Sequence, residues 1–212
     1  MGVCMLEGQF ITFLIAITLL TISPGVDTLL VMRNTARGGW KDGLVTSLGI
    51  CSGLFVHAAV SAVGISVILL QSAWAFNALK FAGALYLIWL GIQSIRNLKA
   101  LPMDQVRGVG VRTTSWIRSI REGLLSNVLN PKTIVFYMAF LPQFISPTQS
   151  PMVQSLFMAG IHFVIGLVWL GILTVVVCRL KSFGASSGIE KWVQGVTGGV
   201  MILLGIKLAA DK

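Results

Sequence analysis

The first long apolar stretch of the chain, FITFLIAITLLTISPGVDTLLVM at residues 10–32, carries the motif Ser23-Pro24-Gly25 near its middle. About 20 apolar residues in a row are enough to cross the hydrocarbon core of a bilayer as a helix. A proline inside such a helix removes one backbone hydrogen bond and clashes with the preceding turn. The sequence therefore predicts a membrane-spanning helix that is broken or kinked near Pro24.

The composition extends this interpretation to the whole chain. Of the 212 residues, 55% are hydrophobic and 11% are charged, whereas a soluble domain carries about 25% charged residues. Too little polar surface remains to cover a soluble globule, so we predict an all-α membrane protein with one transmembrane domain over residues 1–212. Six stretches are long and apolar enough to span: 10–32, 44–70, 73–95, 124–145, 152–178 and 193–209.

The basic residues lie in alternate connections between these spans. The connections after the first, third and fifth spans hold 12 of the 16 lysines and arginines, and the other two connections hold none. This alternation follows the positive-inside rule. It predicts a multi-pass protein of the bacterial inner membrane with both termini outside. The net charge of +9 therefore indicates membrane topology, and no nucleic-acid partner is expected.

The two halves of the chain repeat an order of motifs. Ser-Pro-Gly at 23–25 is matched by Asn-Pro-Lys at 130–132, and His57 in the second span is matched by His162 in the fifth. Because each half holds three helices, the second half would cross the membrane in the opposite sense, as in many secondary transporters. We predict repeat 1 at about 7–96, a cytoplasmic linker at about 97–120 and repeat 2 at about 121–210.

The two proline motifs also resemble helix starts. Serine and asparagine are good N-caps, and proline is favoured at the first helical position. A half-helix that begins in mid-membrane would point free N–H groups and the positive end of its dipole toward the centre. Two such ends would suit an anionic group such as a carboxylate. The alternative is a simple proline kink without a ligand.

Two charged side chains accompany these motifs, namely Asp27 in the first span and Lys132 in the fourth. Charges inside a membrane are costly and usually mark ion or substrate pathways. Asp27 suits a substrate ammonium or a proton, and Lys132 suits a carboxylate. The alternatives are a structural ion pair between the two, or an Asp27 close enough to the membrane interface to be solvated. The candidate substrate-binding residues are Ser23, Pro24, Gly25, Asp27, Asn130, Pro131 and Lys132.

Asp27, His57 and His162 form a candidate proton relay, because histidine titrates near neutral pH. Hydrogen-bonded packing histidines are an equal alternative. The chain has no HExxH metal motif and no GxxxxGK nucleotide loop, so we predict no enzyme activity, metal or cofactor. The small-residue pairs Gly49–Gly53 and Gly195–Gly199 indicate close helix packing. Such packing serves contacts within the chain and is also compatible with a homodimer.

Three stretches resemble the LysE/RhtB amino-acid exporter family, closest to its homoserine/threonine-exporter branch. SPGVDTLLVMRNTARGGWKDGLVTSLGICSG is similar to the first two helices of that family, NALKFAGALYLIWLGIQSIR to the third and NPKTIVFYMAFLPQFI to the fourth. The resemblance implies export of threonine-, homoserine- or leucine-like neutral amino acids from the cytoplasm, driven by the proton gradient. Its motifs point to Ser23-Pro24-Gly25 and Asn130-Pro131-Lys132 as central residues. Many members have proline and asparagine where this chain has Val26 and Asp27.

Two other functions stay open at this point. The first is export of a cation or another small metabolite. The second is a non-transporting membrane scaffold that recruits a partner through the basic segment 96–121. The paired helix breaks and Asp27 weigh against a scaffold, which has no use for polar groups in mid-membrane.

Overall fold

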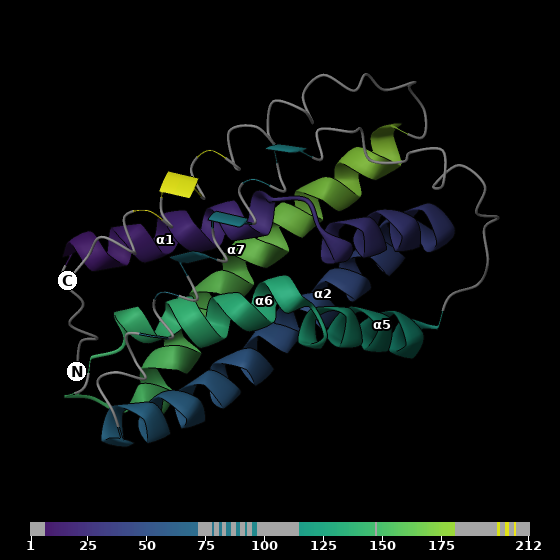
Figure 1. The fold of residues 1–212 in the computed structure, drawn as a ribbon. Coiled ribbons are helices and arrows are strands. Elements are labelled where there is room, and N and C mark those ends of the chain that lie inside the picture. Colours follow the sequence, from purple (N-terminus) through teal and green to yellow (C-terminus); the bar gives the residue numbers. More distant parts are fainter. Residues whose placement is uncertain are drawn as a thin grey trace.

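A computed structural model describes residues 7–71, 115–146 and 148–180, and every regular element in these ranges is a helix (Figure 1). The predicted third and sixth spans lie mostly outside the described residues. The positions of these two spans that are described are helical: 78, 81, 84, 85, 88, 89, 92, 95, 199, 202, 203 and 206. The six-span repeat therefore stays a prediction, while the helical class is confirmed.

The first span is broken at Ser23-Pro24-Gly25, as the sequence predicts. Helix α1 covers Glu7–Ile22, and helix α2 covers Val26–Gln71. Two expectations are wrong in detail. Helix α2 begins at Val26, so Pro24 is not its first residue, and α2 continues through residues 33–43, where a connection was expected.

A sharp bend at Gly39 divides α2 into two helical parts. The backbone there has φ 77° and ψ −165°, a conformation that is essentially restricted to glycine. The chain folds back at this bend. The evidence is a hydrogen bond across it, which the Asn34 side chain donates to Thr46 Oγ1 at 2.9 Å. The bend thus replaces the predicted loop, and several of its polar side chains bond to one another.

The fourth span is also broken at its predicted motif. Helix α5 covers Trp116–Val128, and helix α6 (Pro131–Val135) begins after Asn130, with a bend of 50° between them. A π-helical turn η1 (Phe136–Phe140) and a 3-10 turn η2 (Leu141–Phe144) follow. The Asn-Pro motif starts a helix as predicted, because the Asn130 side chain accepts a hydrogen bond from the Lys132 backbone N–H at 3.0 Å.

Helix α5 begins at Trp116, eight residues before the expected start of the fourth span at 124, so the end of the predicted linker 97–120 is helical. The reason lies in its packing. Ser119, Gly123 and Asn127 form a buried stripe at a spacing of four residues. This stripe faces α2 and extends the helix beyond its apolar run.

Glycines bring the α2 and α5 backbones into direct contact. A Cβ atom at Gly49 would overlap the Ile120 carbonyl oxygen, and one at Gly123 would overlap the Thr46 carbonyl oxygen. A Cβ atom at Gly53 would lie 2.6 Å from Asn127 Oδ1. The close packing predicted for the Gly49–Gly53 pair is confirmed, whereas Gly195 lies outside the described residues.

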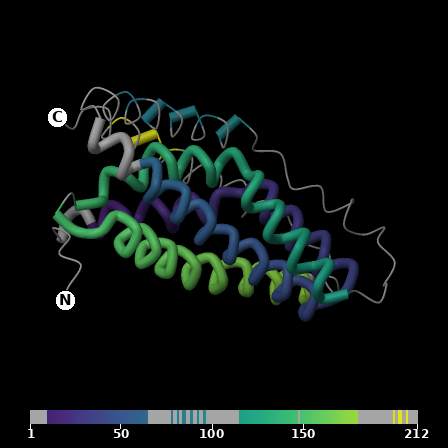
Figure 2. The backbone as a smooth tube through the Cα atoms, turned by 90° about the horizontal axis from the view of Figure 1, so that it is seen from below, coloured from purple at the N-terminus to yellow at the C-terminus, as the bar shows by residue number. Residues whose placement is uncertain are grey.

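Helix α7 (Pro151–Leu180) is the predicted fifth span and runs alongside α2 (Figure 2). Within the described ranges, two helices are long and apolar enough to cross a membrane, Val26–Gly64 and Pro151–Arg179. The bent pair α5–α6 provides a third span if it is counted as one. Helix α1 contributes a shorter apolar helix, Phe10–Ile22.

We predict that Gly39→Ala lowers the free energy of unfolding by about 1–3 kcal/mol, because this backbone conformation is strongly unfavourable for alanine. No atom lies within 4 Å of the added Cβ, so the loss would be conformational and not steric. Gly38→Ala is the matched control, since Gly38 has helical backbone angles. Thermal unfolding of the purified protein in detergent measures both. An equal shift of the unfolding temperature for the two variants would show that the Gly39 conformation does not need glycine.

Candidate functional site at the two helix breaks

The breaks in the first and fourth predicted spans both line one small cavity. Its volume is about 60 Å³, which is room for roughly four to six water molecules. The cavity brings together six of the predicted site residues: Ser23, Gly25, Asp27, Asn130, Lys132 and His162. Pro24, Pro131 and His57 are not in its lining.

The break after α1 leaves a backbone carbonyl without a helical donor. In a continuous helix the N–H of residue 24 would bond to the Leu20 carbonyl oxygen, and proline has no N–H. The Lys132 ammonium fills this place, donating to Leu20 O at 2.6 Å and to Ser23 O at 2.7 Å. Lys132 thus crosses from the second break to satisfy the first.

The break after α5 also leaves a backbone carbonyl without its helical donor. Pro131 lacks the N–H that would bond to the Asn127 carbonyl oxygen. His57 Nε2 lies 3.0 Å from that oxygen, and the Asn130 N–H also donates to it at 2.9 Å. Because a carbonyl only accepts, Nε2 of His57 must carry the proton in this contact. His57 therefore caps a helix end in this structure, and the proton relay stays a prediction.

Asp27 crosses in the opposite direction, from the first break to the second. Its carboxylate accepts hydrogen bonds from Ser126 Oγ at 2.7 Å, Asn127 Nδ2 at 3.0 Å and Asn130 Nδ2 at 3.0 Å. It also lies in the first turn of α2, where the helix dipole favours a negative charge. Among the ion pairs of the described residues none joins Asp27 to Lys132, so the two charges are satisfied separately.

The N-terminal end of α6 is occupied by its own cap. Asn130 Oδ1 accepts from the Lys132 N–H at 3.0 Å, and the Asn130 carbonyl oxygen accepts from the Thr133 N–H at 3.1 Å. The first residue, Pro131, has no N–H to offer. The free backbone donors that the sequence predicted for an anion at this end are thus already bonded.

His162 belongs to a directed chain of hydrogen bonds. Thr21 Oγ1 donates its only hydrogen to Ile17 O at 2.6 Å, so it must accept from His162 Nε2 at 3.0 Å. In a neutral ring, Nδ1 then accepts from the Tyr137 hydroxyl at 3.1 Å. The Tyr137 and His162 rings stack with centroids 5.9 Å apart. Sequence reasoning missed Tyr137, although it is one of only two tyrosines and lies in an apolar run.

A second polar cluster ties the bend of α2 to α5. Arg37 bonds to Asp42 at 3.1 Å across the bend and lies 3.4 Å from Glu122 of α5. Ser119 also donates to Asp42, and Arg33 and Arg118 bind Glu122 at 3.0 and 2.7 Å. We call Arg37, Asp42, Ser119 and Glu122 the bend cluster. None of its members lines the cavity.

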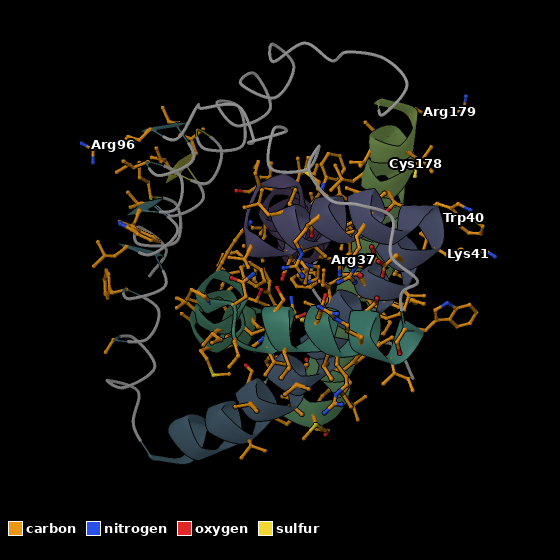
Figure 3. The ribbon with its side chains drawn as sticks, turned by 90° about the vertical axis from the view of Figure 1, so that its right-hand side faces the viewer. Arg37, Trp40, Lys41, Arg96, Cys178 and Arg179 are labelled. Carbon is orange, nitrogen blue, oxygen red and sulfur yellow. The ribbon has the colours of Figure 1, made fainter. Side chains whose placement is uncertain are left out.

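Several of the described basic residues lie at the end of the molecule that the bend cluster marks, while Arg96 lies apart from them in Figure 3. Figure 3 shows Arg37 pointing inward, whereas Trp40 and Lys41 point outward beside Arg179 at the end of α7. The bend and the C-terminal part of α7 are in contact, because a Cβ atom at Gly43 would lie 2.7 Å from Thr174. Basic residues from three of the predicted connections thus lie at the same end.

We predict that Asp42→Asn lowers the free energy of unfolding by about 3 kcal/mol, because it leaves the buried Arg37 guanidinium without its main partner. The side chains of Arg37 and Asp42 are only 10% and 1% exposed. Arg33→Gln is the control: that side chain is 53% exposed, and its ion pair is worth at most about 1 kcal/mol. Thermal unfolding in detergent compares them, and equal losses would refute the prediction.

Comparison with known proteins shows which family this chain belongs to. The family model for LysE type translocators matches residues 18–212. The chain is 32% identical to the uncharacterized membrane protein YrhP of Bacillus subtilis (89% of this chain, 92% of the relative) and 31% identical to the homoserine/homoserine lactone efflux protein of Salmonella typhimurium (94% and 95%). It is 25% identical to the threonine efflux protein of Escherichia coli (96% and 98%). No solved structure matches. The chain is a membrane protein that belongs to the LysE type translocator family.

Proposed function

We propose that this protein is a secondary transporter that exports neutral amino acids of the threonine, homoserine or leucine type, driven by the proton gradient. The observation that carries the proposal is the placement of one carboxylate, Asp27, and one ammonium, Lys132, in the lining of a cavity between two broken helices. The names of the relatives from Salmonella typhimurium and Escherichia coli support an amino-acid substrate.

Both charged groups have bonding capacity left for a zwitterion. An ammonium has three donors, and Lys132 uses two of them on backbone carbonyls. A carboxylate has about four acceptor positions, and three donors approach Asp27. The substrate carboxylate would take the third donor of Lys132, and its ammonium would take the free position on Asp27. An apolar wall would receive a neutral side chain, and it consists of Leu20, Ile50, Cys51, Leu54 and Leu170.

The small volume of the cavity supports a state of the transporter in which the substrate site is closed. Ligand pockets typically measure about 300–1,000 Å³, and this cavity holds about 60 Å³. An amino acid would enter only after the walls separate. We propose that the chain forms two inverted repeats of three spans, and that rocking of one repeat against the other opens the cavity to each side in turn.

The proposed orientation follows from the charges. The basic end around the bend cluster would face the cytoplasm of a bacterial inner membrane, and both termini would lie outside. Exposed Trp40 and Trp116, at 55% and 65% exposure, would sit at the cytoplasmic headgroup level, where tryptophan is enriched.

Uptake of labelled threonine and homoserine into inside-out vesicles tests the function. Accumulation that requires the protein and a proton gradient is the expected result. A protein that carries no amino acid but moves a metal cation would favour the alternative function of cation export. A protein that moves neither would favour a scaffold.

We predict that Asp27→Asn abolishes proton-driven net export and leaves the fold intact, because asparagine cannot titrate. The amide oxygen can accept from Asn127 and Asn130, and the amide nitrogen can donate to Ser126, whose hydroxyl is able to accept. Exchange of labelled for unlabelled substrate should survive, since it needs no net proton movement.

The comparison variant is Asp27→Leu, which removes these hydrogen bonds and should lose both net export and exchange. Membrane abundance of each variant is measured alongside transport. Full proton-driven export by Asp27→Asn at normal abundance would exclude Asp27 from coupling. Because no direct ion pair joins the two residues, adding Lys132→Met is not expected to restore function.

A further inference from the structure

The C-terminal end of α1 presents backbone oxygens that its own helix leaves unpaired. The last carbonyls of any α-helix lack intrahelical donors. In α1 the Leu19 oxygen is satisfied by the Ser23 N–H at 2.9 Å, while the Leu20 oxygen loses its donor because residue 24 is proline. The negative end of the helix dipole lies at the same place. This end of α1 thus has the chemistry of a cation site.

The position of Lys132 is explained by that site and not by its own helix. Lys132 is the second residue of α6, where the helix dipole disfavours a positive charge. Its Nζ lies 2.6 and 2.7 Å from the oxygens of Leu20 and Ser23, more than 100 residues away in sequence. Carbonyl oxygens at an interrupted helix therefore bind the Lys132 ammonium, as such oxygens bind a free cation.

In secondary transporters with broken helices, the unwound carbonyls and half-helix C-terminal ends commonly coordinate the coupling ion. We propose that the carbonyl end of α1 is a cation-binding site whose permanent occupant is the Lys132 ammonium, in place of a free monovalent cation such as Na⁺. The proposal rests on the transport function proposed above. It makes transport independent of Na⁺ and makes Lys132 a positioning residue for the α1 break as well as a substrate contact.

The test replaces the tethered cation with a free one. Lys132→Ala removes four heavy atoms, Cγ, Cδ, Cε and Nζ, and propylammonium supplies the same four. Purified Lys132→Ala protein in proteoliposomes exchanges labelled threonine, with propylammonium at equal concentration and pH on both faces so that no pH gradient forms. We expect exchange to fall by about tenfold or more in the variant, as for the loss of hydrogen bonds to a charged group, and to recover severalfold with propylammonium.

Tetramethylammonium is the matched control, because it has the same charge and no N–H donor, and it should restore nothing. Wild-type exchange should be unchanged when choline replaces Na⁺. A Na⁺ requirement in the wild type would overturn the proposal. So would a folded Lys132→Ala protein that propylammonium does not rescue, or one that tetramethylammonium rescues equally.

A readout without substrate separates this proposal from the transport function. Propylammonium should raise the thermal unfolding midpoint of Lys132→Ala and leave that of the wild type unchanged, even if no amino acid is carried. Wild-type protein without any amino-acid exchange would refute the function alone. If Lys132→Ala does not accumulate, Lys132→Arg and Lys132→Met are compared. Near-normal abundance for arginine and a loss for methionine support the cation site, and equal abundance overturns it.

Discussion

Two prolines impose the constraint on which this structure depends. Pro24 and Pro131 each remove the backbone donor of a carbonyl four residues earlier, and a freed carbonyl within a membrane span needs a replacement donor. The replacements are side chains from distant parts of the chain: Lys132 serves the Leu20 carbonyl, and His57 serves the carbonyl of residue 127. The Leu20 carbonyl at the first break thus depends on a distant side chain, while the carbonyl of residue 127 also accepts from the nearby Asn130 N–H.

This exchange of partners also builds the cavity. Lys132 reaches from the second break to the first, and Asp27 reaches from the first break to the second. Both charges are held by hydrogen bonds without forming an ion pair with each other, so each keeps capacity for a ligand. Close contact through Gly49 and Gly123 holds α5, which ends at the second break, against α2. The residues that bond to the freed backbone groups therefore also place the charges in the cavity, and helix packing holds them there.

The sequence predicted those features that depend on local chemistry. Ser-Pro-Gly and Asn-Pro-Lys located both breaks, and a Gly–x₃–Gly pattern located the close packing. It could not predict features that depend on contacts between distant residues. The segment around Gly39 has the polar composition of a loop, yet its polar groups bond within the bend cluster and the chain stays helical up to the bend. Spacing alone also could not show that Lys132 binds carbonyls and not Asp27, or that Tyr137 orients His162.

The central claim is that a solute binds in the cavity between the two breaks, and Cys51 offers a direct measurement. This thiol lines the cavity and is 1% exposed. With Cys4 and Cys178 replaced by serine, the rate of Cys51 alkylation by N-ethylmaleimide reports access to the cavity. The account predicts that threonine or homoserine slows alkylation, with the same concentration dependence as transport. Saturating transport with an unchanged alkylation rate at Cys51 would contradict it.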